Sequence, residues 1–180
     1  MKLAPLTIVS DRQDLEKVEN RRRTNEVIGV VNGLGEIVLA GNSGTEPLNA
    51  DNALWLAQGN HGGYLLAKPR TRIDGAAGAS VVEVATHRST STVQGVNYTA
   101  AVVLEDGAQV FIGCTFRQDN VAQLVAAVAG AKATFIGCTF YGSGLTQVVD
   151  NPGVITDIVL LGCHNATGAA AGNVTEIGGV

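Results

Sequence analysis

Positive charge is scarce in this chain, and so is charge of any kind. Only 16% of the 180 residues are charged, and 12 lysines and arginines against 16 acidic residues leave a net charge of −4. Proteins with a general affinity for nucleic acid normally present a basic patch, so we expect no nucleic-acid partner. No apolar run approaches the roughly 20 residues needed to span a bilayer, and we expect no membrane partner either.

Cysteine is also rare, and the chain opens without the charged and apolar regions of a secretory signal. The three cysteines are an odd number and include no close C-x-x-C pair. We therefore expect free thiols in a protein that is made in a reducing cytoplasm.

Aromatic residues make up only 4% of the chain, and only six acidic residues lie between positions 89 and 180. A saccharide groove normally offers several aromatic rings, and glycoside hydrolysis needs two carboxyl groups about 5 to 9.5 Å apart. Glu105 and Asp106 are adjacent and precede Gly107, which is typical of a solvated turn rather than of a catalytic pair. His61 and His87 are expected in loops or turns. No catalytic residue is predicted, and we do not expect an enzyme.

An internal repeat is the most informative feature that the chain does have. Residues 110–116 return almost unchanged as residues 134–140, 24 positions later, and a fainter copy follows at residues 159–165. A fixed period of this length is typical of a solenoid, in which each repeat forms one coil that buries its apolar face against its neighbours. With 23 glycines to form turns, the repeat predicts an all-β fold made of stacked parallel coils.

Stacking places equivalent residues of successive coils about 4.8 Å apart, and side chains alternate along each strand. This alternation predicts two inward ladders: Ile112, Ile136 and Leu161, and Cys114, Cys138 and Cys163. A straight column of thiols cannot surround a tetrahedral zinc ion, so no metal and no cofactor is predicted. The residues at the alternate positions of the same strands are expected to point outward as an apolar strip. Because exposed apolar surface usually marks an interaction site, this strip is the predicted subunit interface: Phe111, Phe135 and Leu160, with Leu124 and Val148 on the next strand.

Composition divides the chain into three parts. Residues 1–28 are expected to form an attachment arm, residues 29–79 an irregular β segment, and residues 80–180 the coils. Ser10 and Gln13 have the spacing of a capping box, which predicts a short helix from residue 10 to about residue 20. The arm is expected to bind a larger assembly through charged side chains: Asp11, Arg12, Lys17, Arg21, Arg22 and Arg23. A solvated basic stretch is the alternative interpretation of residues 21–23.

The sequence Phe-Ile-Gly-Cys-Thr-Phe after an apolar strand, at a 24-residue period, resembles the right-handed parallel β-helix of the pectate-lyase-like superfamily. More narrowly, it resembles the trimeric β-helical proteins of tailed-phage virions, such as tailspikes and capsid decoration proteins. The resemblance covers roughly residues 80–180. It implies a short right-handed parallel β-helix after a less regular N-terminal segment, and three chains packed side by side through apolar β faces.

Two functions follow as expectations. The first is a structural virion protein: a homotrimeric capsid decoration (cement) protein that binds the major capsid protein or another virion protein and stabilises a phage head. The second is a tailspike-type β-helix that binds or cleaves carbohydrate, which would need an acidic pair such as Glu105 and Asp106 on an exposed groove. The outward apolar strip, the charged arm and the lack of a recognisable catalytic set favour the first.

Overall fold

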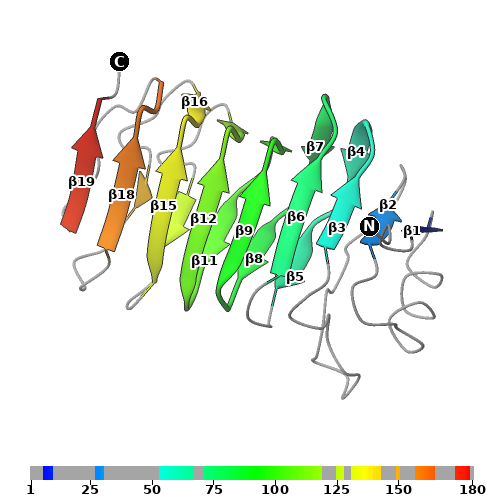
Figure 1. Ribbon diagram of the computed structural model, residues 1–180. Coiled ribbons are helices and arrows are strands. Elements are labelled where there is room, and N and C mark those ends of the chain that lie inside the picture. Colours follow the sequence, from blue (N-terminus) through cyan, green and yellow to red (C-terminus); the bar gives the residue numbers. More distant parts are fainter. Residues whose placement is uncertain are drawn as a thin grey trace, which may run out of the picture.

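The chain folds as a parallel β-solenoid, shown in a computed structural model (Figure 1). The structure describes residues 6–9, 27–30, 53–66, 71–118, 125–127, 131–142, 149–150, 157–164 and 173–178. These residues form three sheets, and every strand pair recorded among them is parallel. The predicted all-β fold of stacked coils is therefore confirmed. The helix predicted from residue 10 to residue 20 lies outside the described residues.

Sheet A is the largest of the three and extends along the whole stack (Figure 1). Its nine strands are, in spatial order, β1 (Leu6–Val9), β2 (Val27–Val30), β3 (Ala53–Leu56), β6 (Thr71–Gly75), β9 (Ser91–Gln94), β12 (Ala108–Ile112), β15 (Lys132–Ile136), β18 (Asp157–Leu161) and β19 (Asn173–Ile177).

Two narrower sheets of five strands each complete the coils. Sheet B contains β5 (Tyr64–Leu66), β8 (Ala85–His87), β11 (Val102–Leu104), β14 (Val125–Ala127) and β17 (Val149–Asp150). Sheet C contains β4 (Gly59–His61), β7 (Ala79–Val81), β10 (Asn97–Tyr98), β13 (Thr115–Arg117) and β16 (Thr139–Tyr141).

Each coil visits sheet C, then sheet B, then sheet A, so that β10, β11 and β12 form one turn and β13, β14 and β15 form the next. The strand register preserves the sequence repeat, because Phe111 pairs with Phe135 and Ile112 pairs with Ile136. One 24-residue repeat is thus one turn of the solenoid. The stack also includes β3 to β6, so coil geometry begins N-terminal to residue 80.

The core of the stack contains two columns of aromatic rings. Tyr98, Phe116 and Phe140 of sheet C stack nearly parallel, with ring centroids 5.1 and 5.2 Å apart. Phe111 and Phe135 of sheet A stack in the same way at 5.0 Å. The columns meet edge to face, for example where Phe116 lies between Phe111 and Phe135 at 5.4 and 5.6 Å. Such offset and T-shaped pairs add about 0.5–1.5 kcal/mol each beyond simple burial. The two columns of rings therefore stabilise the observed register of the coils.

Candidate functional site

The apolar residues on the outer face of sheet A are not those that were predicted from the alternation of side chains along the repeat. Phe111 and Phe135 are fully buried, and Leu160 is only 2% exposed, so all three line the interior of the coil. Their assignment to an outward subunit interface is wrong. The side chains that the sequence placed inside are those on the outer face: Ile112, Ile136 and Leu161.

A glycine corner explains the reversal. Gly113 and Gly137 have φ angles of +57° and +58°, in the left-handed region that other residues avoid, and each turns the chain from sheet A into sheet C. Because this corner interrupts the strand, the alternation of side chains does not continue across it. Phe111 points inward before the corner and Cys114 points inward after it, although they are three positions apart, an offset that would place them on opposite faces of an uninterrupted strand.

The prediction that the three cysteines point inward is confirmed. Cys114, Cys138 and Cys163 are at most 1% exposed and are free thiols. The thiols of Cys138 and Cys163 donate to main-chain carbonyls of the preceding coil, at 3.4 Å in both cases. The hydrogen bond to Cys114 and burial both raise the pKa of Cys138, which keeps it a thiol. Within the described residues no group of three or more potential ligands could hold a metal ion.

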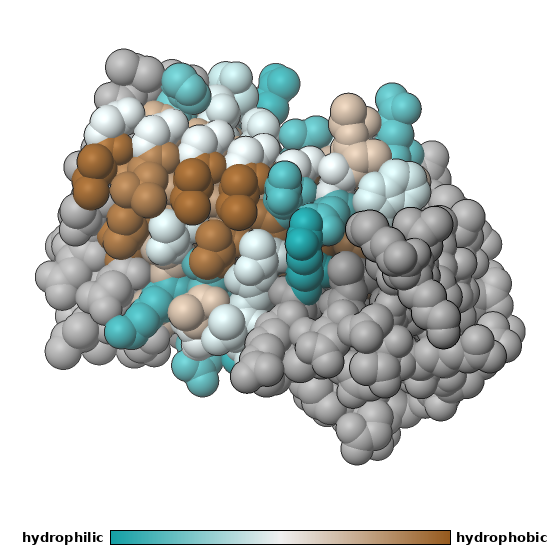
Figure 2. Space-filling view, viewed as in Figure 1, coloured by the Kyte–Doolittle hydropathy of each residue, from teal (hydrophilic) through white to brown (hydrophobic). Residues whose placement is uncertain are grey.

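The actual outward ladder gathers apolar side chains on one half of sheet A. Its members lie in register on neighbouring strands: Ile112 of β12, Ile136 of β15, Leu161 of β18 and Ile177 of β19. Ile136 is 38% exposed and Ile177 is 57% exposed. Figure 2 shows them as a continuous hydrophobic row across the face of the sheet. We call these four residues the apolar ladder.

The apolar ladder ends toward the N-terminal coils, where the same row becomes polar. Gln94 of β9 follows Ile112 in register, and Asp74 of β6 follows Gln94. Asp74 forms an ion pair with Arg72, with its Oδ2 atom 2.8 Å from the Arg72 Nε atom. The outer face of sheet A is therefore divided into an apolar C-terminal half and a polar region beside it.

The other residues predicted for subunit contact and attachment lie outside the part of the chain that the structure describes. They are Leu124 and Val148, and the arm residues Asp11, Arg12, Lys17, Arg21, Arg22 and Arg23. Their predicted roles therefore stay predictions.

Glu105 and Asp106 take part in structural contacts at a bend. The Glu105 carboxylate forms an ion pair with Arg88, whose side chain belongs to the coil before it. The Oδ1 atom of Asp106 accepts a hydrogen bond from the Gly107 amide at 2.6 Å, and Gly107 has a φ of +80°. This is the turn geometry that the sequence indicates.

No helix among the described residues has the length and apolarity to cross a membrane.

A buried polar cluster inside the coils is a feature that the sequence analysis missed. The Tyr64 hydroxyl bonds the Tyr98 hydroxyl and lies 3.1 Å from Nε2 of His87, whose Nδ1 lies 2.9 Å from Oγ of Ser91. Burial lowers the pKa of His87 to about 3, so the imidazole is neutral, and burial raises the pKa of Tyr64 well above its ordinary value.

The expectation that His61 and His87 occupy loops is wrong, because both are buried in strands, β4 and β8. A sequence signal for this did exist. Tyr98 occupies the column position of Phe116 and Phe140, so its hydroxyl had to find a partner inside the coil.

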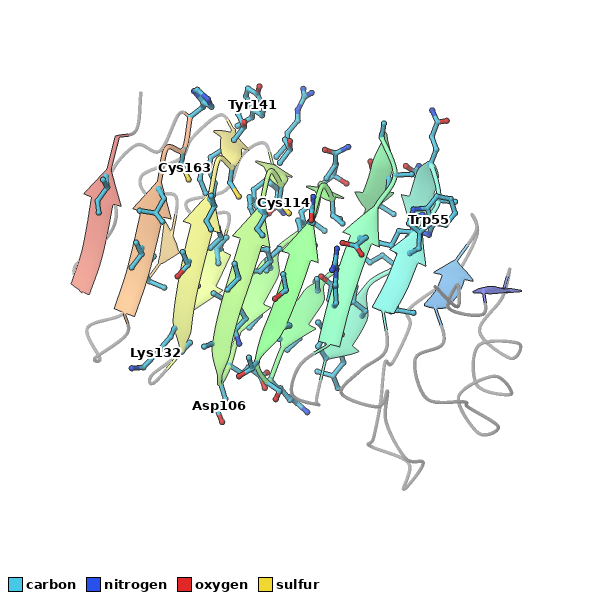
Figure 3. All side chains as sticks on the ribbon, viewed as in Figure 1. Trp55, Asp106, Cys114, Lys132, Tyr141 and Cys163 are labelled. Carbon is cyan, nitrogen blue, oxygen red and sulfur yellow. The ribbon has the colours of Figure 1, made fainter. Side chains whose placement is uncertain are left out.

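A groove of about 460 Å³ lies on the outer face of sheet C. Short polar side chains form one side of it, with Asn97 and Thr115 in register on β10 and β13. Arg117 and Tyr141, in register on β13 and β16, form the other side, and both are exposed. Figure 3 shows Tyr141 projecting from the end of β16 away from the stack. Ser80, Tyr98 and Thr99 complete the lining.

Comparison with known proteins gives no match for this chain: no family model, no curated protein and no solved structure is significantly similar to it. The two surfaces described above, the apolar ladder and the groove on sheet C, are therefore interpreted from their own chemistry.

Proposed function

We propose that this protein is a structural component that associates with further copies of itself through the apolar ladder on sheet A. The observation that carries the proposal is the in-register row of Ile112, Ile136, Leu161 and Ile177 on an outer face. Contiguous apolar surface of this kind on a folded protein usually marks an interaction site. Its regular spacing across parallel strands gives a surface that a second sheet can cover.

Burial energetics support association. Full removal of an isoleucine or leucine side chain from water contributes about 1.5–3 kcal/mol, and Ile136 and Ile177 retain 38% and 57% of their exposure in the single chain. Several such side chains in one row, repeated on each copy, supply a hydrophobic centre for an interface. The ion-paired Arg72 and Asp74 and the polar Gln94 lie beside this centre and would form part of its hydrated rim.

The larger role that we propose is that of a trimeric decoration protein of a tailed-phage capsid. The repeat's resemblance to trimeric β-helical virion proteins supports this role, and it carries with it the right-handed sense of the coil. In this proposal the charged residues between β1 and β2 attach the trimer to the major capsid protein or another virion protein, and the solenoid projects from the particle. Such a protein stabilises the head by bridging neighbouring capsid subunits, without catalysing a reaction.

The test of self-association is the mass of the purified protein in solution, measured by sedimentation velocity at micromolar concentration. We expect the wild-type chain to sediment as a trimer. Ile136→Lys places a charge in the apolar ladder and should yield monomers. Gln94→Lys adds the same charge to the polar part of the same row and is the matched control, which should stay trimeric. A monomeric wild type, or a trimer unaffected by Ile136→Lys, would contradict the proposal.

The attachment role is tested separately with phage heads that lack decoration. The full chain should co-sediment with the heads, and a chain in which Arg21, Arg22 and Arg23 are changed to glutamate should form trimers that do not. This variant keeps β1 and β2 of sheet A in place. Coating of the heads by the variant would show that these charged residues have another purpose.

A further inference from the structure

We propose that Asp106 is a site of isoaspartate formation, a modification that reroutes the main chain through the Asp106 side chain at the turn before β12. The reaction needs no enzyme and no co-reactant other than water. Asp106 is exposed, and Figure 3 shows it projecting from one end of the stack. The turn lies at the opposite end of β12 from Ile112, so this inference is independent of the self-association proposed above.

Isoaspartate forms through a small ring that the chain makes with itself. The main-chain nitrogen of Gly107 attacks Cγ of Asp106 in its acid form, and the new N–Cγ bond replaces the bond between Cγ and the hydroxyl oxygen. The Gly107 N–H proton and this hydroxyl leave together as water, and the product is a succinimide. A water molecule then opens the ring. Opening at the Asp106 main-chain carbonyl gives isoaspartate, whereas opening at Cγ restores aspartate.

The Gly107 nitrogen already lies beside the carboxyl group that it would attack. It is 2.6 Å from Oδ1 of Asp106, and Cγ is bonded to that oxygen. The recorded partner of this N–H is thus the Asp106 side chain rather than a main-chain carbonyl of a neighbouring coil. Groups that a fold holds at contact distance react much faster than groups that must first find one another. Glycine also lacks a side chain that would hinder the approach.

Asp74 and Gly75 form a second Asp-Gly pair among the described residues, and their geometry is the opposite. Both belong to β6, which pairs with β3 on one side and with β9 on the other. The two carboxylate oxygens of Asp74 lie 3.0 and 2.8 Å from Nε of Arg72. The main chain of Gly75 packs tightly, since an added Cβ would lie 2.7 Å from the carbonyl oxygen of Gly95. Ring closure at Asp74 would disrupt a paired strand, so we expect Asp74 to be stable.

Isoaspartate at residue 106 should loosen the coils, because the turn is held on both sides. The modification adds one CH2 group to the main chain. On the side of the preceding coil, Gly107 packs against Ser89 and Thr90, and an added Cβ would lie 2.5 Å from the Thr90 nitrogen. On the side of the following coil, the Gly107 carbonyl accepts a hydrogen bond from the Lys132 amide at 3.1 Å. The additional CH2 group therefore has to displace one of these contacts.

The main-chain carbonyl of Asp106 would change chemically as well. It accepts a hydrogen bond from Nε2 of Gln109, which also donates to the Ser89 carbonyl at 3.1 Å. Gln109 is only 1% exposed. In isoaspartate this carbonyl becomes part of a carboxylate, so a charge would lie against a buried amide. Partial removal of a charge from water is costly, and this cost adds to the strain of the longer main chain.

The experiment is to incubate the folded, full-length protein in mildly acidic buffer and to follow isoaspartate by peptide mapping. Trypsin separates the two pairs, because it leaves Asp74 in a peptide of residues 73–88 and Asp106 in a peptide of residues 89–117. Electron-transfer fragmentation distinguishes isoaspartate from aspartate in each peptide. We expect isoaspartate to accumulate at least about tenfold faster at Asp106 than at Asp74. In urea, where the turn and the strand are both lost, the two rates should agree within about threefold.

Matched variants connect the reaction to the turn. Asp106→Asn forms the same succinimide with loss of ammonia, and its conversion to the acid should be at least about tenfold faster than that of Asp74→Asn. Asp106→Glu keeps the charge but needs a larger ring that closes slowly, and it should stay unmodified. After incubation, the wild type should unfold at a lower urea concentration than before, whereas Asp106→Glu should not change. Circular dichroism verifies that each variant folds.

Three results would overturn the inference. The first is isoaspartate at Asp106 in the unfolded chain but not in the folded one, which would show that the turn protects this residue. The second is an equal rate at Asp74 and Asp106 in the folded protein. The third is an incubated wild type that contains isoaspartate at residue 106 and unfolds at the same urea concentration as fresh protein. None of these results depends on whether the protein forms trimers.

Discussion

Two adjacent residues, Phe135 and Ile136, should respond very differently to the same substitution. Phe135 is fully buried, stacks on Phe111 at 5.0 Å, and contacts the edges of Phe116 and Phe140 at 5.6 and 5.7 Å. Replacing a buried phenylalanine by a small residue costs about 3–5 kcal/mol, and a threonine hydroxyl left without a partner there costs a further 1 kcal/mol or more, roughly. We therefore expect Phe135→Thr to lower the free energy of unfolding by at least about 4 kcal/mol.

Ile136→Thr should cost far less, about 1 kcal/mol or less. Its side chain is on the outer face, it is 38% exposed, and threonine keeps the β-branched shape that strands favour. Thr134 already occupies an outward position two residues earlier on the same strand.

Urea unfolding of the dilute protein measures both variants. With a slope of about 2 kcal/mol per molar urea, Phe135→Thr should lower the midpoint by about 2 M, and Ile136→Thr by about 0.5 M or less. If Phe135→Thr does not fold, the milder Phe135→Leu should still lower the midpoint more than Ile136→Thr does. Raising the protein concentration distinguishes a core residue from an interface residue, because only the midpoint shift caused by Ile136→Thr should then change. Equal shifts for the two threonine variants in dilute solution would refute the assigned facing of the strand.

Three further predictions concern the corner, the polar cluster and the thiols. Gly137→Ala should lower the free energy of unfolding in urea by roughly 1–2 kcal/mol. The cause is backbone conformation alone, since an added Cβ meets no atom within 4 Å. Gly137→Asn should lower it less, because asparagine tolerates a positive φ. An equal cost for both would show that the left-handed corner is not the cause. Burial holds the pKa of His87 at about 3, below its ordinary 6.5, so its contribution to stability is complete above pH 6.5 and is lost as the pH falls toward 3, by up to about 4–5 kcal/mol. Urea titrations across this pH range should therefore show a shallower fall for His87→Gln, and parallel curves would contradict the prediction. Finally, a thiol reagent such as Ellman's should modify the three cysteines at least about tenfold more slowly in the folded chain than in urea. The reason is that Cys114, Cys138 and Cys163 are all buried. Fast reaction of the native protein would place a thiol at the surface.

The stacking of the coils could be predicted in detail from the repeat. Two copies of one segment, 24 residues apart, require equivalent environments, and the structure pairs Phe111 with Phe135 and Thr115 with Thr139 in neighbouring coils. The burial of the cysteines followed from the same pattern. The sequence could not locate the groove on sheet C, because Asn97 and Tyr141 are far apart in the chain and share one surface only after three coils have stacked.

The sequence by itself determined the period, the parallel pairing and the register, because identical apolar segments are buried best against one another. Only the tertiary structure decided which side of each strand faces solvent. Alternation gives two faces but does not say which is inner, and the answer depends on a corner where Gly113 and Gly137 adopt a conformation that reverses the pattern. That choice buries the phenylalanines and leaves Ile112, Ile136, Leu161 and Ile177 on the outer face.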